Sequence, residues 1–204
     1  ESKLLALKRD MGLLGPATEA EEPKALNSGG MEVDAEIVVE EAAGRLPVIA
    51  GAGSNDTRVA ILNANHAQKL GADAALHVAG YYNRPSQEGL FRHFEAVHEA
   101  TELPIIVYNI PPRAVVDILP ETMARIAELP RVVGVKDATG DVSRVSKQRA
   151  SCGPDFIQLS GEDATVVPFL AQGGHGCISV TANVAPALCA ALHEAWKGGD
   201  LKEV

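Results

Sequence analysis

Short apolar runs alternate along the chain with longer segments in which apolar residues recur every three or four positions. Six of the short runs predict strands, at residues 47–53, 74–80, 104–110, 131–138, 156–163 and 177–183. Each run is nearly all apolar, which is typical of a parallel sheet covered on both faces. The runs start roughly 20–30 residues apart, the length of one strand with its crossover helix and loops. A βα barrel and an open doubly wound sheet both fit this spacing, and the alternation favours the barrel only slightly.

Capping residues predict where several of the intervening helices begin and end. Asn55 or Asp56 can cap a helix that stops at Gly71, and Ser86 can start the next one. Pro120 suits the first turn of a third helix, because its missing N–H has no intrahelical partner there. These helices separate consecutive predicted strands, as a parallel sheet requires.

The first 34 residues differ from the rest of the chain. They contain Gly-rich turns and an acidic cluster, and no apolar run there is long enough for a central strand. Residues 35–43 return to helical character, and a last helix follows Ala190. We therefore expect an irregular N-terminal arm over residues 1–34 and a βα-barrel domain with six recognisable strand-helix units over residues 35–204.

Composition and charge narrow the function classes. The net charge of −9 argues against a nucleic-acid partner or an anionic membrane, because phosphate-binding surfaces need an excess of Lys and Arg. No apolar run approaches the roughly 20 residues of a membrane span, and the first ten residues lack the apolar stretch of a secretory signal. We expect a cytoplasmic protein. Its 204 residues suffice for one domain but fall short of the about 250 typical of an eight-unit barrel.

Cysteine and histidine are not arranged as metal ligands. Cys152, Cys177 and Cys189 lack metal-ligand spacing, and the six histidines are dispersed. We expect buried free thiols, and we expect neither a metal nor another cofactor.

Polar residues end three of the predicted strands, where reactive groups collect in parallel βα folds. These residues are Tyr108, Asn109, Lys136, Asp137, Gly161, Glu162 and Asp163. Lys136 follows the apolar run VVGV, and desolvation there would lower its pKa and favour a nucleophilic amine. Alternatively, its ammonium pairs with Asp137 or Asp163. Tyr108 either passes protons beside Lys136 or is an ordinary strand-end tyrosine with an exposed hydroxyl.

Five segments resemble one known family in order and spacing: YYNRPSQEG (81–89), VYNIPPR (107–113), VGVKDATGD (133–141), LSGEDA (159–164) and GGHGCISVTANV (173–184). Over residues 35–199 the chain resembles the dihydrodipicolinate synthase family, whose members are TIM (β/α)8-type barrels that condense pyruvate with aspartate semialdehyde through a lysine Schiff base. The resemblance implies a dimer or tetramer that uses no metal.

The resemblance also implies roles for individual residues. Lys136 would form the imine with pyruvate, and Tyr108 would relay protons. Tyr82 would join that relay from a neighbouring subunit, and Arg113 would receive the carboxylate of the aldehyde. Two further residues would line the pyruvate pocket: Gly161 and Ile178.

The family pattern is incomplete in this chain. A Gly-Thr-Thr-Gly-Glu-Ser loop would fall near residues 18–23, which read TEAEEP, so Thr18 receives no role. The first two barrel strands are unrecognisable, and the helical region after the eighth is missing beyond Val204. Two alternatives therefore stay open. One is a degenerate non-catalytic relative that acts by association, and the other is a related keto-acid aldolase, against which Arg113 argues.

The lysine-feedback pocket of the family is only partly matched. Asn55 and Tyr81 correspond to residues of that pocket, whereas Ser28 and Met31 stand where its histidines would fall and Val59 where its glutamate would. We expect no normal inhibition by lysine.

Overall fold

Six parallel strands form a single sheet in chain order. The computed structural model describes residues 28–204, with side chains from residue 35 onward. The strands are β1 (Ile49–Gly51), β2 (Ala74–Val78), β3 (Ile105–Asn109), β4 (Val132–Asp137), β5 (Ile157–Ser160) and β6 (Gly176–Cys177). Each strand overlaps one of the six predicted runs, so the predicted parallel βα order is confirmed.

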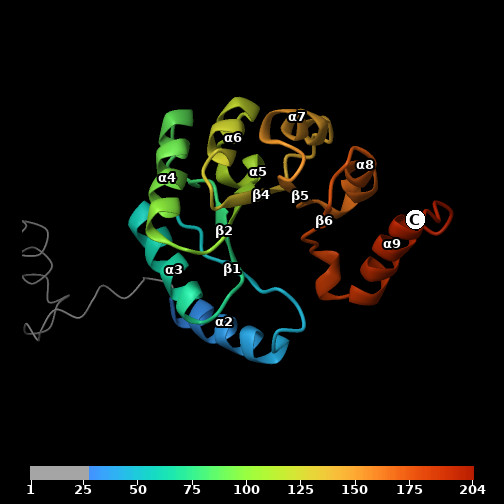
Figure 1. The fold of residues 1–204 in the computed structure, drawn as a ribbon, viewed down its shortest axis with the longest axis horizontal. Helices are drawn as coiled ribbons and strands as arrows, with labels where there is room; N and C mark the ends of the chain where they lie inside the picture. The colour runs from blue at the N-terminus through green and yellow to red at the C-terminus, as the bar shows by residue number, and fades with distance from the viewer. Residues whose placement is uncertain (1–27) are drawn as a thin grey trace, which may run out of the picture.

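Apart from one short helix at the strand ends, the helices lie outside the curved sheet and follow it in an arc from α2 to α9 (Figure 1). They are α2 (Ser28–Ala42), α3 (Thr57–Lys69), α4 (Gln87–Ala100), α5 (Pro111–Ala114), α6 (Pro120–Ala127), α7 (Ser143–Cys152), α8 (Val166–Ala171) and α9 (Pro186–Gly198). Two 3-10 helices, η1 (Asp163–Thr165) and η2 (Thr181–Asn183), flank the last strand. Within residues 28–204, none of the helices has the length and apolar character that crossing a membrane demands.

The predicted helix ends match the structure. The Asp56 carboxylate accepts the N–H of Arg58 at 2.9 Å and caps α3, and Gly71 beyond its end has a φ of +85°. The Ser86 hydroxyl accepts the N–H of Gly89 at 3.1 Å and caps α4. Pro120 occupies the first turn of α6. Local chemistry therefore sets these boundaries.

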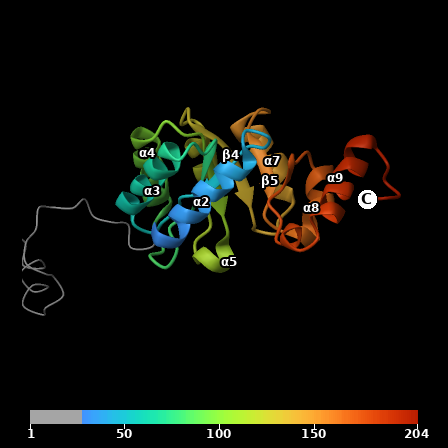
Figure 2. The ribbon, with the colours of Figure 1, turned by 90° about the horizontal axis from the view of Figure 1, so that it is seen from below.

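The expected N-terminal arm ends earlier than the sequence indicated. Helix α2 begins at Ser28, so residues 28–34 are helical instead of irregular. Two glycines in that stretch lower its intrinsic helix propensity, which is why the pattern did not predict a helix there. Residues 1–27, including the segment 18–23, lie outside the described residues. Figure 2 shows α2 crossing the side of the domain near α3.

The two faces of the sheet differ in burial, contrary to the expectation of a sheet covered on both sides. Residues that point toward the helices are fully buried, as Val107 and Val135 are beside Leu90 and Phe94 of α4. The opposite face carries Leu76, Val78, Tyr108 and Lys136, each only half-buried. Within residues 28–204 the strand order leaves β1 and β6 as sheet edges, so the concave face stays open.

The sixth strand is shorter than predicted. Ladder pairing stops at Cys177, although Ile178 still donates its N–H to the carbonyl of Ser160 at 2.9 Å. The Asp163 carboxylate then accepts the N–H groups of Val180 at 3.1 Å and Thr181 at 3.0 Å. These bonds turn the chain into η2, an outcome that depends on a residue 17–18 positions away.

Candidate active site

Tyr108 and Lys136 are register partners at the carboxyl ends of β3 and β4. Because side chains alternate along a strand, directly paired residues point to the same face of the sheet. The Nζ atom of Lys136 lies 4.0 Å from the centroid of the Tyr108 ring. The sequence left open whether Tyr108 lies beside Lys136, and the structure has the two side chains in contact through the ring face of the tyrosine.

Lys136 forms no ion pair with either neighbouring carboxylate. Asp137 follows it in the strand and therefore points to the other face, where it accepts from Thr139 Oγ1 at 2.6 Å and Gln148 Nε2 at 3.1 Å. The Asp163 carboxylate instead accepts the N–H groups of Val180 and Thr181 at the start of η2. Among residues 28–204 the Lys136 amine has neither a carboxylate nor a hydrogen-bond partner, so the ion-paired interpretation is wrong for the described part of the chain.

Burial lowers the pKa of the Lys136 amine, because desolvation penalises the ammonium form, while the negative charge of a Cys177 thiolate opposes this shift. Burial likewise raises the pKa of the Tyr108 phenol, with the Arg113 guanidinium acting in the opposite sense. Both shifts favour the neutral forms of an amine and a phenol in contact. Such a pair has the groups needed to attack a carbonyl carbon and to move protons during the attack.

Gly161 leaves room for the stem of Lys136. A Cβ atom at position 161 would lie 3.1 Å from Lys136 Cε and 2.8 Å from Ala138 Cβ. The glycine follows β5, and its N–H donates to the carbonyl of Asp137 at 2.7 Å. Close approach of this backbone therefore fixes one wall beside the amine.

A cavity of about 490 Å³ lies on the concave face beside Tyr108. Its wall comes from the ends of β1, β2 and β3 and from α5: Gly51, Gly53, Leu76, Val78, Tyr81, Tyr108, Ile110, Arg113 and Ala114. Most of this wall is apolar, and Arg113 supplies its positive charge. A guanidinium in such a wall can bind a carboxylate through two parallel hydrogen bonds.

Of the other residues singled out from the sequence, Tyr81 lines this cavity, whereas Tyr82, Ile178 and Asn55 do not. Tyr82 is 86% exposed and has a φ of +69°, a left-handed conformation that is costly for a tyrosine. Ile178 follows the last pair of the β5–β6 ladder and donates its N–H to the carbonyl of Ser160. The Asn55 carbonyl accepts from Asn83 Nδ2 at 2.9 Å, and Tyr81 lines the cavity itself. The structure thus brings Lys136 into contact with Tyr108, and it has Tyr108 and Arg113 in the wall of the same cavity.

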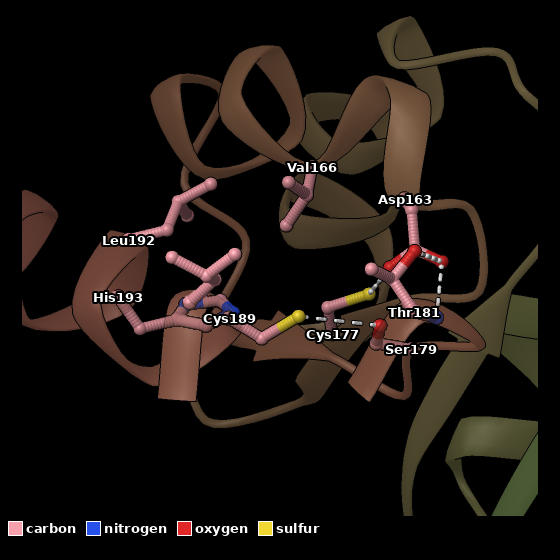
Figure 3. A pocket seen from close by; sticks show the side chains of 9 residues that line it. Asp163, Val166, Cys177, Ser179, Thr181, Cys189, Leu192 and His193 are labelled. Carbon is pink, nitrogen blue, oxygen red and sulfur yellow. Dashed lines mark hydrogen bonds between the residues drawn. The ribbon is translucent and has the colours of Figure 1, made fainter. Parts of the chain in front are cut away.

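A second cavity, of about 250 Å³, lies between η1, η2 and α9 (Figure 3). Cys177 and Cys189 both line this cavity, whereas Cys152 does not. All three cysteines are free thiols, and all three are half-buried, not buried as expected. Burial raises the pKa of the Cys177 thiol to about 11, and nearby Asp163 adds to the shift. No group of three His, Cys, Asp or Glu side chains in residues 28–204 could hold a metal ion.

Sequence comparison places the chain among known proteins. The model of the dihydrodipicolinate synthetase family matches residues 19–204. The chain is 61% identical over 189 residues to the 4-hydroxy-tetrahydrodipicolinate synthase of Ruegeria pomeroyi, covering 93% of this chain and 65% of the relative. The corresponding protein of Roseobacter denitrificans is 60% identical with the same coverage. The chain thus spans about 65% of the length of these curated relatives.

Solved structures give a consistent result. The dihydrodipicolinate synthase of Aquifex aeolicus superimposes with a TM-score of 0.84 at 40% identity, covering 89% of this chain and 62% of that one. The chloride-inhibited dihydrodipicolinate synthase of Acinetobacter baumannii, a complex with pyruvate, has a TM-score of 0.78 at 43% identity, covering 85% and 61%.

Proposed function

Because the chain belongs to the dihydrodipicolinate synthetase family, we propose that it is a lyase that condenses pyruvate with aspartate semialdehyde to 4-hydroxy-tetrahydrodipicolinate, in lysine biosynthesis. The observation that carries the proposal is the half-buried amine of Lys136, free of any carboxylate partner in residues 28–204 and in contact with Tyr108. A lysine with an ordinary pKa is neutral in only about one molecule in 2500 at pH 7, so a nucleophilic lysine needs such surroundings.

The first chemical step joins Lys136 to pyruvate. The neutral amine attacks the carbonyl carbon of pyruvate, and the resulting carbinolamine loses water to give a protonated imine. The oxygen leaves as water and therefore gains two protons, one that the nitrogen loses and one taken up from solution. The Tyr108 hydroxyl is suited to pass these protons, because its raised pKa keeps it protonated at neutral pH.

The second step forms the carbon–carbon bond. The positive imine nitrogen withdraws electrons, so the pyruvate methyl group loses a proton and an enamine forms. The enamine carbon then attacks the aldehyde carbon of the second substrate, and the aldehyde oxygen takes up a proton. The amine of that substrate next attacks the imine carbon, which closes the ring and releases the neutral Lys136 amine. No cofactor is needed for this sequence.

Arg113 would bind the carboxylate of aspartate semialdehyde, because it contributes the positive charge to the 490 Å³ cavity beside Tyr108. Gly161 and Ile178 would border the pyruvate side. The Acinetobacter baumannii relative was solved with pyruvate, which supports a keto acid as the first substrate. A related aldolase for larger, sugar-derived keto acids would have less use for a guanidinium at this point.

We further infer that the sheet forms six of the eight strands of a TIM (β/α)8-type barrel, with β1 and β6 at the open edges. An exposed edge strand is a pairing surface, so two more strands would complete the backbone hydrogen bonds and close the cavity. The exposed Tyr82, held at positive φ, would reach the site of a second subunit in a homo-oligomer.

Reduction with borohydride in the presence of pyruvate tests the proposal. The imine becomes a stable secondary amine, and peptide mass spectrometry locates it. The adduct should be on Lys136 and should disappear in Lys136→Ala. Lys147→Ala is the matched control, because this lysine lies exposed on α7 and should leave the adduct unchanged. A chain without an adduct on residue 136 would instead be a non-catalytic relative that acts by association.

A further inference from the structure

The segment that carries Arg113 runs from the end of β3 to the start of α6 and contains a costly backbone conformation. It comprises the four-residue helix α5 and a short connection in which Val115 has a φ of +60°. A β-branched residue avoids this left-handed region, so neighbouring contacts must hold the segment in place. The cavity wall depends on these neighbouring contacts, because Arg113 and Ala114 both belong to the segment that they fix in place.

Asn109 and Arg144 supply these contacts from two different strand-helix units. Asn109 is fully buried; its Oδ1 accepts the N–H of Ile118 at 3.1 Å, and its Nδ2 donates to Asp117 Oδ1 at 2.9 Å. Arg144, from the first turn of α7, donates through Nη1 to Asp117 Oδ1 at 2.9 Å and to the carbonyl of Ile118 at 3.1 Å. Its second guanidinium nitrogen contacts the other oxygen of Asp117.

Gln87, in the first turn of α4, makes a third attachment to the same segment. Its Nε2 donates to the carbonyl of Asp117 at 2.8 Å, and its Oε1 accepts the N–H of Leu119 at 3.1 Å. Asp117 is thereby fixed through both its carboxylate and its backbone. Three helices or strands, β3, α4 and α7, converge on residues 117–119, which we name the Asp117 clamp.

The ion pair at the centre of the clamp is sheltered from solvent. The Arg144 side chain is 11% exposed and that of Asp117 is 31% exposed, and the pair is bidentate. Removing one partner of such a pair leaves the other charge unpaired in a poorly solvated place. Arg144 also belongs to the unit that follows β4, so the clamp ties the unit of Lys136 to the segment of Arg113.

We propose that Arg144 and Asp117 are positioning residues that hold Arg113 at the cavity and thereby set the affinity for the carboxylate-bearing second substrate. This inference rests on the proposed function. Neither residue lines the cavity, and none of their hydrogen bonds within residues 28–204 reaches Lys136 or Tyr108, so both act through the segment between them and Arg113. Loss of the clamp should weaken use of the aldehyde while imine formation with pyruvate continues.

The test compares Arg144→Gln and Arg144→Lys with the unchanged chain. Pyruvate is titrated to half-maximal borohydride trapping, and aspartate semialdehyde is titrated separately, at saturating pyruvate, to half of the maximal rate of its consumption. In Arg144→Gln the aldehyde midpoint should rise by at least about tenfold, while the pyruvate midpoint should stay within about twofold. Arg144→Lys keeps the charge and one donor and should recover part of the loss.

Arg92→Gln is the matched control. Arg92 lies on α4 and pairs with Glu88 and Glu95 on the exposed face, so its removal breaks ion pairs without touching the clamp. Both of its midpoints should equal those of the unchanged chain. An equal change of both midpoints in Arg144→Gln, an unchanged aldehyde midpoint, or no recovery in Arg144→Lys would each overturn the inference.

Hydrogen–deuterium exchange separates this inference from the proposed function. Amides of residues 113–119 should exchange at least about tenfold faster in Arg144→Gln, while β2 keeps its protection. If the unchanged chain forms no pyruvate adduct, the proposed function has failed and exchange alone decides whether the clamp holds the segment. Unaltered exchange over residues 113–119 would then overturn the clamp.

Discussion

The backbone at Gly161 passes so near Lys136 that a Cβ there would lie 3.1 Å from the Cε atom of the lysine. The same Cβ would meet Ala138 Cβ at 2.8 Å, which is closer than real contacts allow, so some atom must move. We predict that Gly161→Ala displaces the Lys136 stem and slows borohydride trapping of pyruvate by about 10- to 100-fold. Gly198→Ala is the control, since a Cβ at that helical glycine meets no atom within 4 Å. Equal trapping rates in the two variants would show that the contact is unimportant.

The contact between Lys136 and Tyr108 involves the ring face, which separates the two roles of the tyrosine. Tyr108→Phe keeps the ring against the amine and removes only the hydroxyl. We expect the rate of imine formation to fall by about 10²- to 10⁴-fold, the usual contribution of a general acid–base group, while the final extent of trapping is preserved. Borohydride reduction of samples taken at successive times measures both the rate of imine formation and the final extent of trapping. A variant with an unchanged rate would remove Tyr108 from the proton relay.

Imine formation should depend on pH in a direction set by the burial of Lys136. Desolvation lowers its pKa below the ordinary value of 10.5, so the neutral, reactive amine appears at lower pH than on a free lysine side chain. The initial trapping rate should rise with pH and level off earlier than that of N-acetyl-lysine amide with the same carbonyl compound. The pH at which the trapping rate is half-maximal is compared between the two. If this pH is equal to or higher than that of N-acetyl-lysine amide, the site does not activate the amine.

Local patterns explain which parts of this architecture were predictable. The first five strand runs and the caps at Asp56 and Ser86 depend on a few neighbouring residues, and the structure has them where the sequence indicated. The separation of Lys136 from Asp137 also follows from alternation along a strand, although the sequence interpretation left their pairing open.

Longer-range features were not predictable from such patterns. Asp117 interrupts an apolar stretch, which signals a buried partner, but Arg144 lies 27 positions away and was not singled out. The open concave face and the early end of β6 likewise depend on which distant segments pack together. The apolar runs alone predict strands that are covered on both faces, because hydrophobicity does not show which segment packs against each face.

His77 should make the fold sensitive to acid. It is fully buried on the helix-facing side of β2, and neither ring nitrogen has a hydrogen-bond partner among residues 28–204. Burial, together with the nearby His93, lowers its pKa to about 3. The unfolded chain binds this proton at an ordinary pKa of about 6.5, so it holds more protons than the folded chain between these two values. The stabilising contribution is therefore complete above pH 6.5 and is lost as the pH falls toward 3, at about 1.4 kcal/mol per pH unit.

Urea unfolding at pH 7 and pH 5 measures this effect. From the His77 contribution alone, the free energy of unfolding should fall by about 2 kcal/mol between these conditions. In His77→Leu, which has a side chain of similar reach and no titrating group, this part of the pH dependence should vanish. Apart from His93, which interacts electrostatically with His77, the same groups titrate in both proteins, so the difference between their two pH slopes reports residue 77 and this one interaction. Parallel slopes would mean that the imidazole gains a proton in the folded state about as readily as in the unfolded chain.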